Sequence, residues 1–392
     1  MKPQRILLIS KRFWPLSGET ELLAAEFARQ LAVMVERVEV VTWKMVRQWP
    51  DCFTLGDVDV HRLPQSQKSS WSAANLGQYG RSRWHRSLQR WLASQTRRFD
   101  AAIVFEHENE TLTPTVAACR AGLPVVSRIP LSPSSELSRV ALRDWKSLMQ
   151  SSVVFVSPRS DLMLNPLCRP DGPLQTLRTV SDGVCSVGKI NDPITARKIL
   201  SQVHPIFQLK QGALLAVSGC DLTYDSGVFG LVRAWRRVVA KHKSARLWLI
   251  GTGHNAPELF QRICDLDLQH SVLLTGNFDD VEEVFSAADL YIQPGTNEPA
   301  GWYSSIAAQT GLTMIRHRKS DRYDELVGAG HSLVFDDETR TLDFVMSRWA
   351  ESQPTEGRVP RRNSSAPDRG VRSVAEMARD YLELLQFEAV AQ

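Results

Sequence analysis

The sequence predicts an α/β protein with two Rossmann-like domains, each built on a doubly wound parallel sheet. Short β-branched and leucine-rich runs alternate with stretches of helical periodicity, the alternation is interrupted once near 185–212, and it then resumes. A chain of 392 residues is long enough for two or three domains. Strands that alternate with helices are expected to be parallel and to be joined by right-handed crossovers.

The first series of elements runs from the N-terminus to about residue 180. Apolar runs of four to seven residues without polar interruption are typical of strands buried on both faces of a sheet. Helical spacing of apolar residues predicts helices over 21–35 and 113–121, and a further helix within 69–99. The expected strands are 5–10, 38–42, 58–63, 101–105, 124–127, 153–156 and 176–180.

The second series begins at residue 213. Its expected strands are 213–217, 246–250, 272–274, 290–292, 314–315 and 333–335, and its expected helices are 228–242, 257–265 and 281–287. Asp192 and Pro193 read as a break in the pattern. The proline- and arginine-rich stretch 351–369 reads as a polar linker, and an amphipathic helix follows over 373–386. These features divide the chain into domains 1–190 and 191–350, a linker 351–371 and a terminal helix 372–392.

Composition limits the function classes. Hydrophobic residues make up 43% of the chain and charged residues 23%, which is ordinary for a soluble globular protein. A net charge of +4 is too small to imply a polyanionic partner, and the six cysteines form no CxxC pair. No apolar run is long enough for a membrane span or a signal peptide. We therefore expect a cytoplasmic protein, in which any membrane association is peripheral.

The segment 291–311 carries the most information about function. A buried strand ends at Pro294, and a helix is expected to start near Gly301 or Trp302, so its free backbone amides point beyond the strand end. Such a helix start favours a phosphate group. Glu298 precedes it and either caps the helix or bonds sugar hydroxyls.

This segment resembles the donor-sugar loop of family 4 glycosyltransferases, which are retaining enzymes of the GT-B fold. Pro294, Glu298, Gly301 and Gly311 fall in the register of that loop. The order of the other motifs also agrees with the family. They are Gly18-Glu19-Thr20-Glu21, Asp182-Gly183-Val184, Leu249-Ile250-Gly251-Thr252-Gly253, Leu273-Leu274-Thr275-Gly276 and Ala287-Ala288-Asp289-Leu290.

The resemblance implies two Rossmann-like domains facing a cleft, with the helix 372–392 packing back on the N-terminal acceptor domain. It also implies a hexosyltransferase-like transfer from a nucleotide-sugar to an acceptor hydroxyl of a glycan or lipid-linked acceptor, with retention and without a metal or other cofactor. Glu298 would then act on the sugar. The expected donor-binding residues are Gly18, Gly219, Gly276, Asn277, Gly301, Trp302 and Arg316.

Three positions depart from the family pattern. Cys220 and Ser226 stand where an arginine and a lysine would neutralise the donor pyrophosphate, and Ile306 stands where a glutamate would hold the ribose. These departures support an alternative, a catalytically impaired GT-B protein that binds or scaffolds. We consider four cations as substitutes, each of which is otherwise a solvated surface residue: Arg128, Arg316, Arg318 and Lys319.

Two further features concern the first domain. His107 lies between two glutamates after an expected strand, so it either contacts the acceptor and moves a proton or is only hydrogen-bonded. The region 69–99 mixes tryptophans with arginines. This mixture suits an anionic membrane surface, a phosphorylated acceptor or RNA. It also suits a plain amphipathic helix with Trp84, Leu88, Trp91 and Leu92 inward. Nucleic acid is the least expected of these partners.

Overall fold

The computed structural model has two compact units, and each is considered by itself. The first comprises Met1–Leu16, Thr20–Gly183 and Arg372–Gln392, and the second comprises Ser17–Glu19 and Val184–Val371. We expected the change of domain after residue 190. The residues that the structure describes are 3–16, 18–63, 78–95, 98–105, 112–129, 148, 152–157, 178–183, 191–220, 222–276, 278, 281–295, 302–318, 332–336, 341–353 and 372–390.

The first unit contains a sheet with the strand order β3-β4-β2-β1-β5-β6-β7-β8. Every pairing is parallel except the one between β3 and β4 at the edge. Apolar runs without alternation place most of these strands in the interior, as expected for a sheet covered on both faces. The strands are β1 (Arg5–Ser10), β2 (Arg37–Trp43), β3 (Cys52–Leu55), β4 (Val58–Leu63), β5 (Ala101–Phe105), β6 (Val125–Arg128), β7 (Val153–Ser157) and β8 (Arg178–Thr179).

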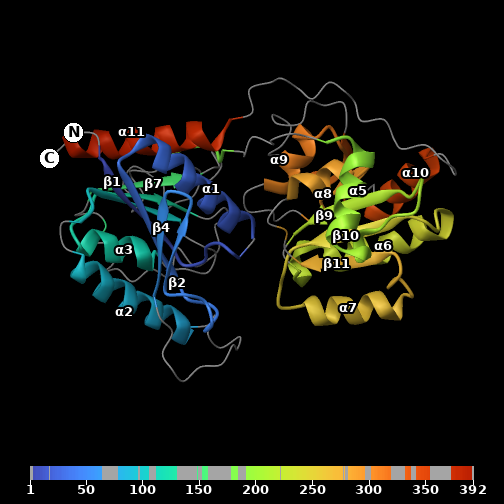
Figure 1. The fold of residues 1–392 in the computed structure, drawn as a ribbon, viewed down its shortest axis with the longest axis horizontal. Helices are drawn as coiled ribbons and strands as arrows, with labels where there is room; N and C mark the ends of the chain where they lie inside the picture. The colour runs from blue at the N-terminus through green and yellow to red at the C-terminus, as the bar shows by residue number, and fades with distance from the viewer. Residues whose placement is uncertain are drawn as a thin grey trace. The chain divides into compact units, whose positions relative to one another are not determined.

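Helices cover both faces of this sheet (Figure 1). The helices α2 (Gln78–Ser94) and α3 (Thr113–Arg120) bury apolar side chains against one face. On the other side, α1 (Glu19–Met34) meets α11 (Val374–Val390) through the rings of Phe27 and Tyr381, whose centroids are 5.0 Å apart. The helix α11 packs on β6 and β7, in the same unit as the N-terminal strands.

The antiparallel edge strand β3 was not among the strands expected from the sequence. Its signal was Gly56-Asp57 between two short extended runs, a combination typical of a two-residue hairpin. Gly56 has a φ of +61°, which the turn requires and which glycine adopts without strain. Cys52–Leu55 has no run of buried residues, because an edge strand needs none, and a search for apolar runs therefore passes over it.

The second unit contains a wholly parallel sheet with the order β11-β10-β9-β12-β13-β14. Ala216, Leu247 and Leu249 contribute to a core on one face of the sheet. The residues that alternate with them, Val217, Trp248 and Ile250, are buried as well, so both faces are covered. The strands are β9 (Leu215–Gly219), β10 (Arg246–Ile250), β11 (Val272–Gly276), β12 (Leu290–Ile292), β13 (Thr313–His317) and β14 (Ser332–Phe335).

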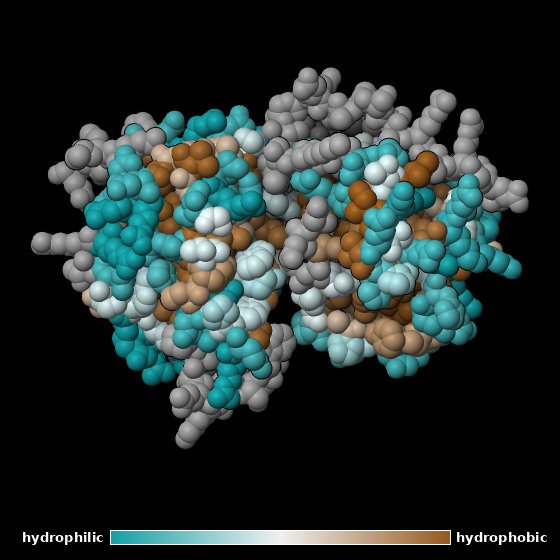
Figure 2. Space-filling model, in the orientation of Figure 1, coloured by the Kyte–Doolittle hydropathy of each residue, from teal (hydrophilic) through white to brown (hydrophobic). Residues whose placement is uncertain are grey.

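Residues of α6 (Val228–Lys241), α7 (Ala256–Asp265) and α10 (Leu342–Ser352) belong to that core. The helices α5 (Pro193–Val203) and α8 (Val281–Ala287) pack together, and α8 contacts α9 (Trp302–Gln309). Figure 2 shows apolar atoms at the surface near α5, where Ile194 and Val203 are exposed.

Asp192 and Pro193 begin a helix, so the interpretation of these residues as a break in the pattern was wrong. The Asp192 carboxylate accepts hydrogen bonds from the amides of Ile194 and Thr195 at 3.0 Å each, and Pro193 occupies the first turn of α5. An acidic N-cap followed by proline is a strong start signal, since the cap satisfies orphan amides of the first turn and proline has no amide to satisfy. None of the described helices is long and apolar enough to cross a membrane.

Candidate functional site

The strand order of the second unit places a topological switch point between β9 and β12. From β9 the chain continues to β10 and β11 on one side, and it then returns to β12 on the other side of β9. Ligands of open parallel sheets bind outside the carboxyl ends of the strands at such a point. The relevant loops here follow Gly219 of β9 and Ile292 of β12.

Two glycines bring these loops together backbone to backbone. Gly227, at the end of the loop after β9, has a φ of +77°, and a Cβ there would overlap the carbonyl of Pro294. A Cβ on Gly295 would lie 2.5 Å from the carbonyl oxygen of Ser226. Any side chain at either position would therefore push the loops apart.

The carboxyl end of β9 also lies close to the start of α9. A Cβ on Gly219 would overlap the ring of Tyr303, so glycine allows this helix to approach the strand. The Tyr303 ring in turn stacks on Phe285 of α8, with ring centroids 6.1 Å apart and planes 6° apart. The packing fixes the first turn of α9, which begins at Trp302 as the sequence predicted.

Some of the buried polar groups that have no hydrogen-bond partner among the described residues lie in this part of the chain. Gln293, directly after β12, is 1% exposed. Neither Oε1 nor Nε2 of its side-chain amide has a hydrogen-bond partner within the described chain. The hydroxyls of Ser218 and Ser305 are equally buried and unpaired there. An unsatisfied buried polar group costs about 1–3 kcal/mol, which makes these groups candidates for ligand contacts. Gln293 was not among the site residues expected from the sequence, although a glutamine that ends an apolar strand was a visible signal.

Two of the positions that depart from the family pattern have structural roles. The Ser226 hydroxyl donates to the carbonyl oxygen of Thr223 at 2.8 Å and so closes the 3₁₀ turn Tyr224–Ser226. Ile306 is 2% exposed, as expected for a side chain that packs its helix on the sheet. Cys220 is half-buried and borders the core of the second unit. None of these side chains supplies the cation or carboxylate of the family pattern.

The cations that we considered as substitutes have different environments. Arg128 forms a two-pronged ion pair with Asp182, with Nε and Nη2 at 2.9 and 2.6 Å from the carboxylate oxygens. Burial by itself lowers the pKa of Arg128, but the Asp182 carboxylate raises it overall. Arg318 pairs with Asp336 at 2.9 Å. Arg128 is thus a buried partner of Asp182, and the expectation of a solvated surface residue was wrong for it.

Some of the remaining expected site residues are described by the structure, and the others lie outside the described ranges. Arg316 lies on β13 and is 4% exposed, so it too is not a solvated surface residue. Gly18 stands half-buried directly before α1, and Gly276 ends β11, where its carbonyl accepts a hydrogen bond from Gly251 at 2.9 Å. Five predicted residues lie outside the described part of the chain, namely Asn277, Glu298, Gly301, His107 and Lys319.

The helix α2 agrees with the amphipathic interpretation of 69–99. Trp84, Leu88 and Leu92 are buried, and Trp91 packs against the same core. The side chains of Arg83, Arg86 and Arg90 are exposed on the opposite side. No cluster of histidine, cysteine and carboxylate side chains suited to a metal ion occurs in the described ranges.

Comparison with known proteins finds a family match over part of the chain and several structures of similar fold. Residues 213–344 match the family model described as "Glycosyl transferases group 1". Structures of similar fold include a glycosyltransferase from Rickettsia africae, with 12% identity, a TM-score of 0.66 and full coverage of both chains. They also include the catalytic domain of starch synthase IV from Arabidopsis thaliana, solved bound to ADP and acarbose, with 13% identity, a TM-score of 0.70 and full coverage of both chains.

Two further matches add detail. Anabaena HepE in complex with UDP-glucose has 14% identity and a TM-score of 0.62, over 99% of this chain and 98% of that chain. The alpha-monoglucosyldiacylglycerol synthase of Streptococcus pneumoniae is 22% identical over 142 residues, which are 36% of this chain and 32% of that protein. The match therefore spans about a third of the length of this curated relative. The chain is a GT-B protein similar to the family 4 glycosyltransferases, as the sequence predicted.

Proposed function

We propose that the protein transfers a sugar from a nucleotide-sugar donor to an acceptor hydroxyl with retention of configuration. The observation that carries this proposal is the switch point between β9 and β12, where glycines bring the two loops together inside the matched segment 213–344. Parallel sheets bind their ligands at such a point. The fold shared with proteins solved with ADP or UDP-glucose supports the same conclusion.

In this proposal the second unit holds the donor. The amides at Gly301 and Trp302 bind the diphosphate at the start of α9, with Arg316 as the candidate cation and Glu298 on the sugar. Gln293 adds a neutral amide contact. Gly276 has open space where a side chain would lie, which lets the donor approach the backbone there. Gly18, Gly219 and Asn277 are the other donor contacts of the proposal.

The chemistry then needs no metal or organic cofactor. Retention relies on the leaving phosphate, which takes the proton of the acceptor hydroxyl as the bond between sugar and phosphate breaks and the new glycosidic bond forms on the same face. Backbone amides and a cation stabilise the charge that develops on the phosphate, because preorganised donors act most strongly on the transition state.

The acceptor side of the proposal concerns the first unit. His107 contacts the acceptor hydroxyl, and the acceptor is a glycan or a lipid-linked molecule. Arg83, Arg86 and Arg90 share one exposed side of α2, which suits an anionic membrane surface. The protein would then be cytoplasmic and peripheral at the inner membrane face. Sedimentation with anionic vesicles tests this part, and equal binding to neutral vesicles would contradict it.

A second candidate function is a GT-B protein that binds or scaffolds without transfer. The observation in its favour is that Ser226 closes a turn and Ile306 is buried where the family pattern has a cation and a carboxylate. Each lost charged contact is worth about 1.5–3 kcal/mol, so donor binding would be weak.

Thermal unfolding with UDP, ADP or GDP in the presence of a chelator separates the two candidates. A ligand at a hundred times its Kd stabilises the folded state by about 2.7 kcal/mol, and we expect one nucleotide to raise the midpoint clearly. Calorimetry with the matching nucleotide-sugar then compares Glu298→Gln with Glu258→Gln, an exposed control on α7. We expect only Glu298→Gln to weaken binding and transfer. No shift with any nucleotide would favour the scaffold.

A further inference from the structure

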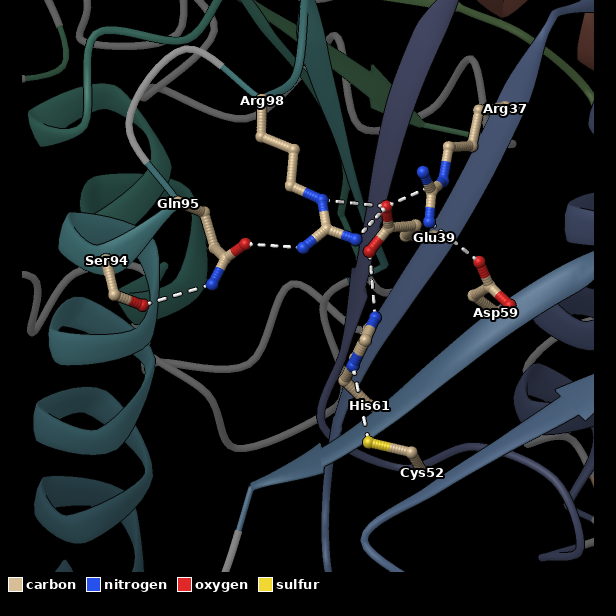
Figure 3. A network of polar contacts seen from close by, with 8 residues as sticks. All are labelled: Arg37, Glu39, Cys52, Asp59, His61, Ser94, Gln95 and Arg98. Atoms are coloured by element: carbon tan, nitrogen blue, oxygen red, sulfur yellow. Dashed lines mark hydrogen bonds and ion pairs between the residues drawn. The ribbon is translucent and has the colours of Figure 1, made fainter.

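Three neighbouring strands at the edge of the first sheet bring a thiol, an imidazole and a carboxylate into line (Figure 3). Cys52 of β3 stands directly opposite His61 of β4 in the antiparallel pair. In the parallel pair of β2 and β4, Val41 is opposite His61. Glu39 is two residues before Val41, so its side chain lies on the same face of the sheet. Strand register alone therefore fixes the order of the three side chains.

The imidazole of His61 lies between the other two groups. Its Nδ1 is 3.5 Å from the Sγ of Cys52, and its Nε2 is 2.8 Å from the Oε2 of Glu39. Because the two contacts use opposite ring nitrogens, the three side chains do not converge on a single ion. This is the order of nucleophile, base and orienting carboxylate that activates nucleophiles in proteins.

Glu39 is held firmly in place. Its side chain is fully buried, and its Oε1 accepts from Nε and Nη2 of Arg98 at 3.0 and 2.7 Å. Nε of Arg37 lies 2.9 Å from the same oxygen. Oε2 is left for His61, and a carboxylate only accepts hydrogen bonds. The proton of that contact therefore belongs to Nε2 of His61, and in the neutral imidazole Nδ1 is the acceptor that faces the thiol of Cys52.

Charged side chains surround the imidazole from β2, from β4 and from the segment after α2. Arg37 also pairs with Asp59 at 3.0 Å, and Arg98 donates to Gln95 at 2.8 Å. Among the described residues, the titratable and charged groups at the site are Cys52, His61, Glu39, Arg37, Asp59 and Arg98.

Cys52 is also accessible to solvent. Among the cysteines of the described ranges it is exposed, whereas Cys119 is buried and Cys220 and Cys264 are half-buried. Trp91 packs beside the His61 ring with centroids 5.6 Å apart and shields the base, whose side chain is 23% exposed. The thiol is therefore accessible from solvent and its base is partly shielded, and a partly exposed thiol beside a histidine is a typical setting of a reactive cysteine.

We propose that Cys52 is a site of reversible covalent modification by thiol–disulfide exchange, with His61 as base and Glu39 as its orienting partner. His61 Nδ1 takes the thiol proton, and the Cys52 thiolate attacks one sulfur of a small disulfide. The disulfide's S–S bond breaks as the new one forms. The departing thiolate takes the proton back from the imidazolium, so no other oxidant is needed.

The rate of this exchange tests the proposal. Full-length protein is treated with an aromatic disulfide such as 5,5′-dithiobis(2-nitrobenzoate), and the modified cysteine is identified by mass spectrometry. We expect Cys52 to react first and Cys52→Ser to lose the fast phase. At pH 7 an ordinary thiol is only a few per cent ionised, so His61→Gln should slow the fast phase about tenfold. The matched control His270→Gln, at an exposed histidine of the second unit, should leave it unchanged.

The pH profile separates activation from a merely structural role. The ratio of parent to His61→Gln rates should be largest below pH 7 and approach one above pH 9, where any thiol is ionised. Should His61→Gln not fold, the parent in its native state is compared with the parent unfolded in urea. A native Cys52 that reacts no faster than the unfolded chain, or equal rates for parent and variant at every pH, would overturn the proposal.

Discussion

Two polar clusters at strand positions differ in how their buried groups are satisfied. At the edge of the first sheet, both oxygens of the buried Glu39 accept from Arg37, Arg98 or His61. At the carboxyl ends of β9 and β12, the Gln293 amide and the Ser218 hydroxyl have no partner within the described residues. A satisfied buried network fixes a structure, whereas unsatisfied groups are available to a ligand. Burial by itself therefore does not mark a binding site.

We expect the greatest loss of stability at a second satisfied pair, Arg128 and Asp182. Arg128→Met leaves a nearly buried carboxylate without its cation, so we expect the free energy of unfolding to fall by about 3–5 kcal/mol in urea titrations. The double variant Arg128→Met with Asp182→Leu should recover most of that loss, because no charge is then left unpaired. If the single change costs under about 1 kcal/mol, the pair is solvated and the comparison of the two clusters loses one of its supports.

An intermediate effect, of opposite sign, is expected at Gln293. Gln293→Leu removes a buried amide that has no described partner, so the free energy of unfolding should stay level or rise by about 1–3 kcal/mol. Binding of a nucleoside diphosphate should weaken about tenfold, as calorimetry can measure. Gln261→Leu is the matched control, because Gln261 is an exposed residue of α7. It should change neither the affinity nor the stability by more than about 0.5 kcal/mol. A marked loss of stability in Gln293→Leu would show that the amide has a partner inside the protein.

The smallest change in stability is expected at Asp100, whose ion pair with Arg5 is partly exposed. Burial raises the pKa of Asp100, but hydrogen bonds from the Arg5 side chain and from the amides of Gln4 and Arg5 lower it overall. Because the folded-state pKa is depressed, the stabilisation is complete above the unfolded pKa near 4 and is lost as the pH falls through the folded value. We expect Asp100→Asn to cost about 1 kcal/mol at pH 7, and a cost that persists at pH 2 would contradict this assignment.

Several elements could be predicted from the sequence because their signals are local. The runs that became β1, β5, β10 and β12 have the predicted bounds, since a largely apolar run between turn residues requires no knowledge of its neighbours. The strand β4 also has its predicted bounds, although polar residues alternate with its valines. The start of α9 at Trp302 followed from Pro294 and the glycines in the same way. The resemblance in motif order was enough for the GT-B fold, which the matches confirm.

Other elements depended on information that was present but easily misread. Asp192 caps α5 although its proline suggested a break, and the short edge strand β3 has no apolar run. Both are decided by hydrogen bonds over two or three residues. Caps and two-residue turns are also local signals, so both elements were within reach of the sequence.

Local patterns in the sequence were enough for most strands and helices, although not for β3 or α5, and for the loop in which a donor is expected. The folded structure alone shows which polar groups are satisfied. It paired Arg128 with Asp182, left Gln293 without a described partner and aligned Cys52, His61 and Glu39. The physical reason is that secondary structure follows from local periodicity. A hydrogen bond between residues far apart in sequence depends instead on which strands lie side by side in the sheet and on their register, and no short segment encodes either.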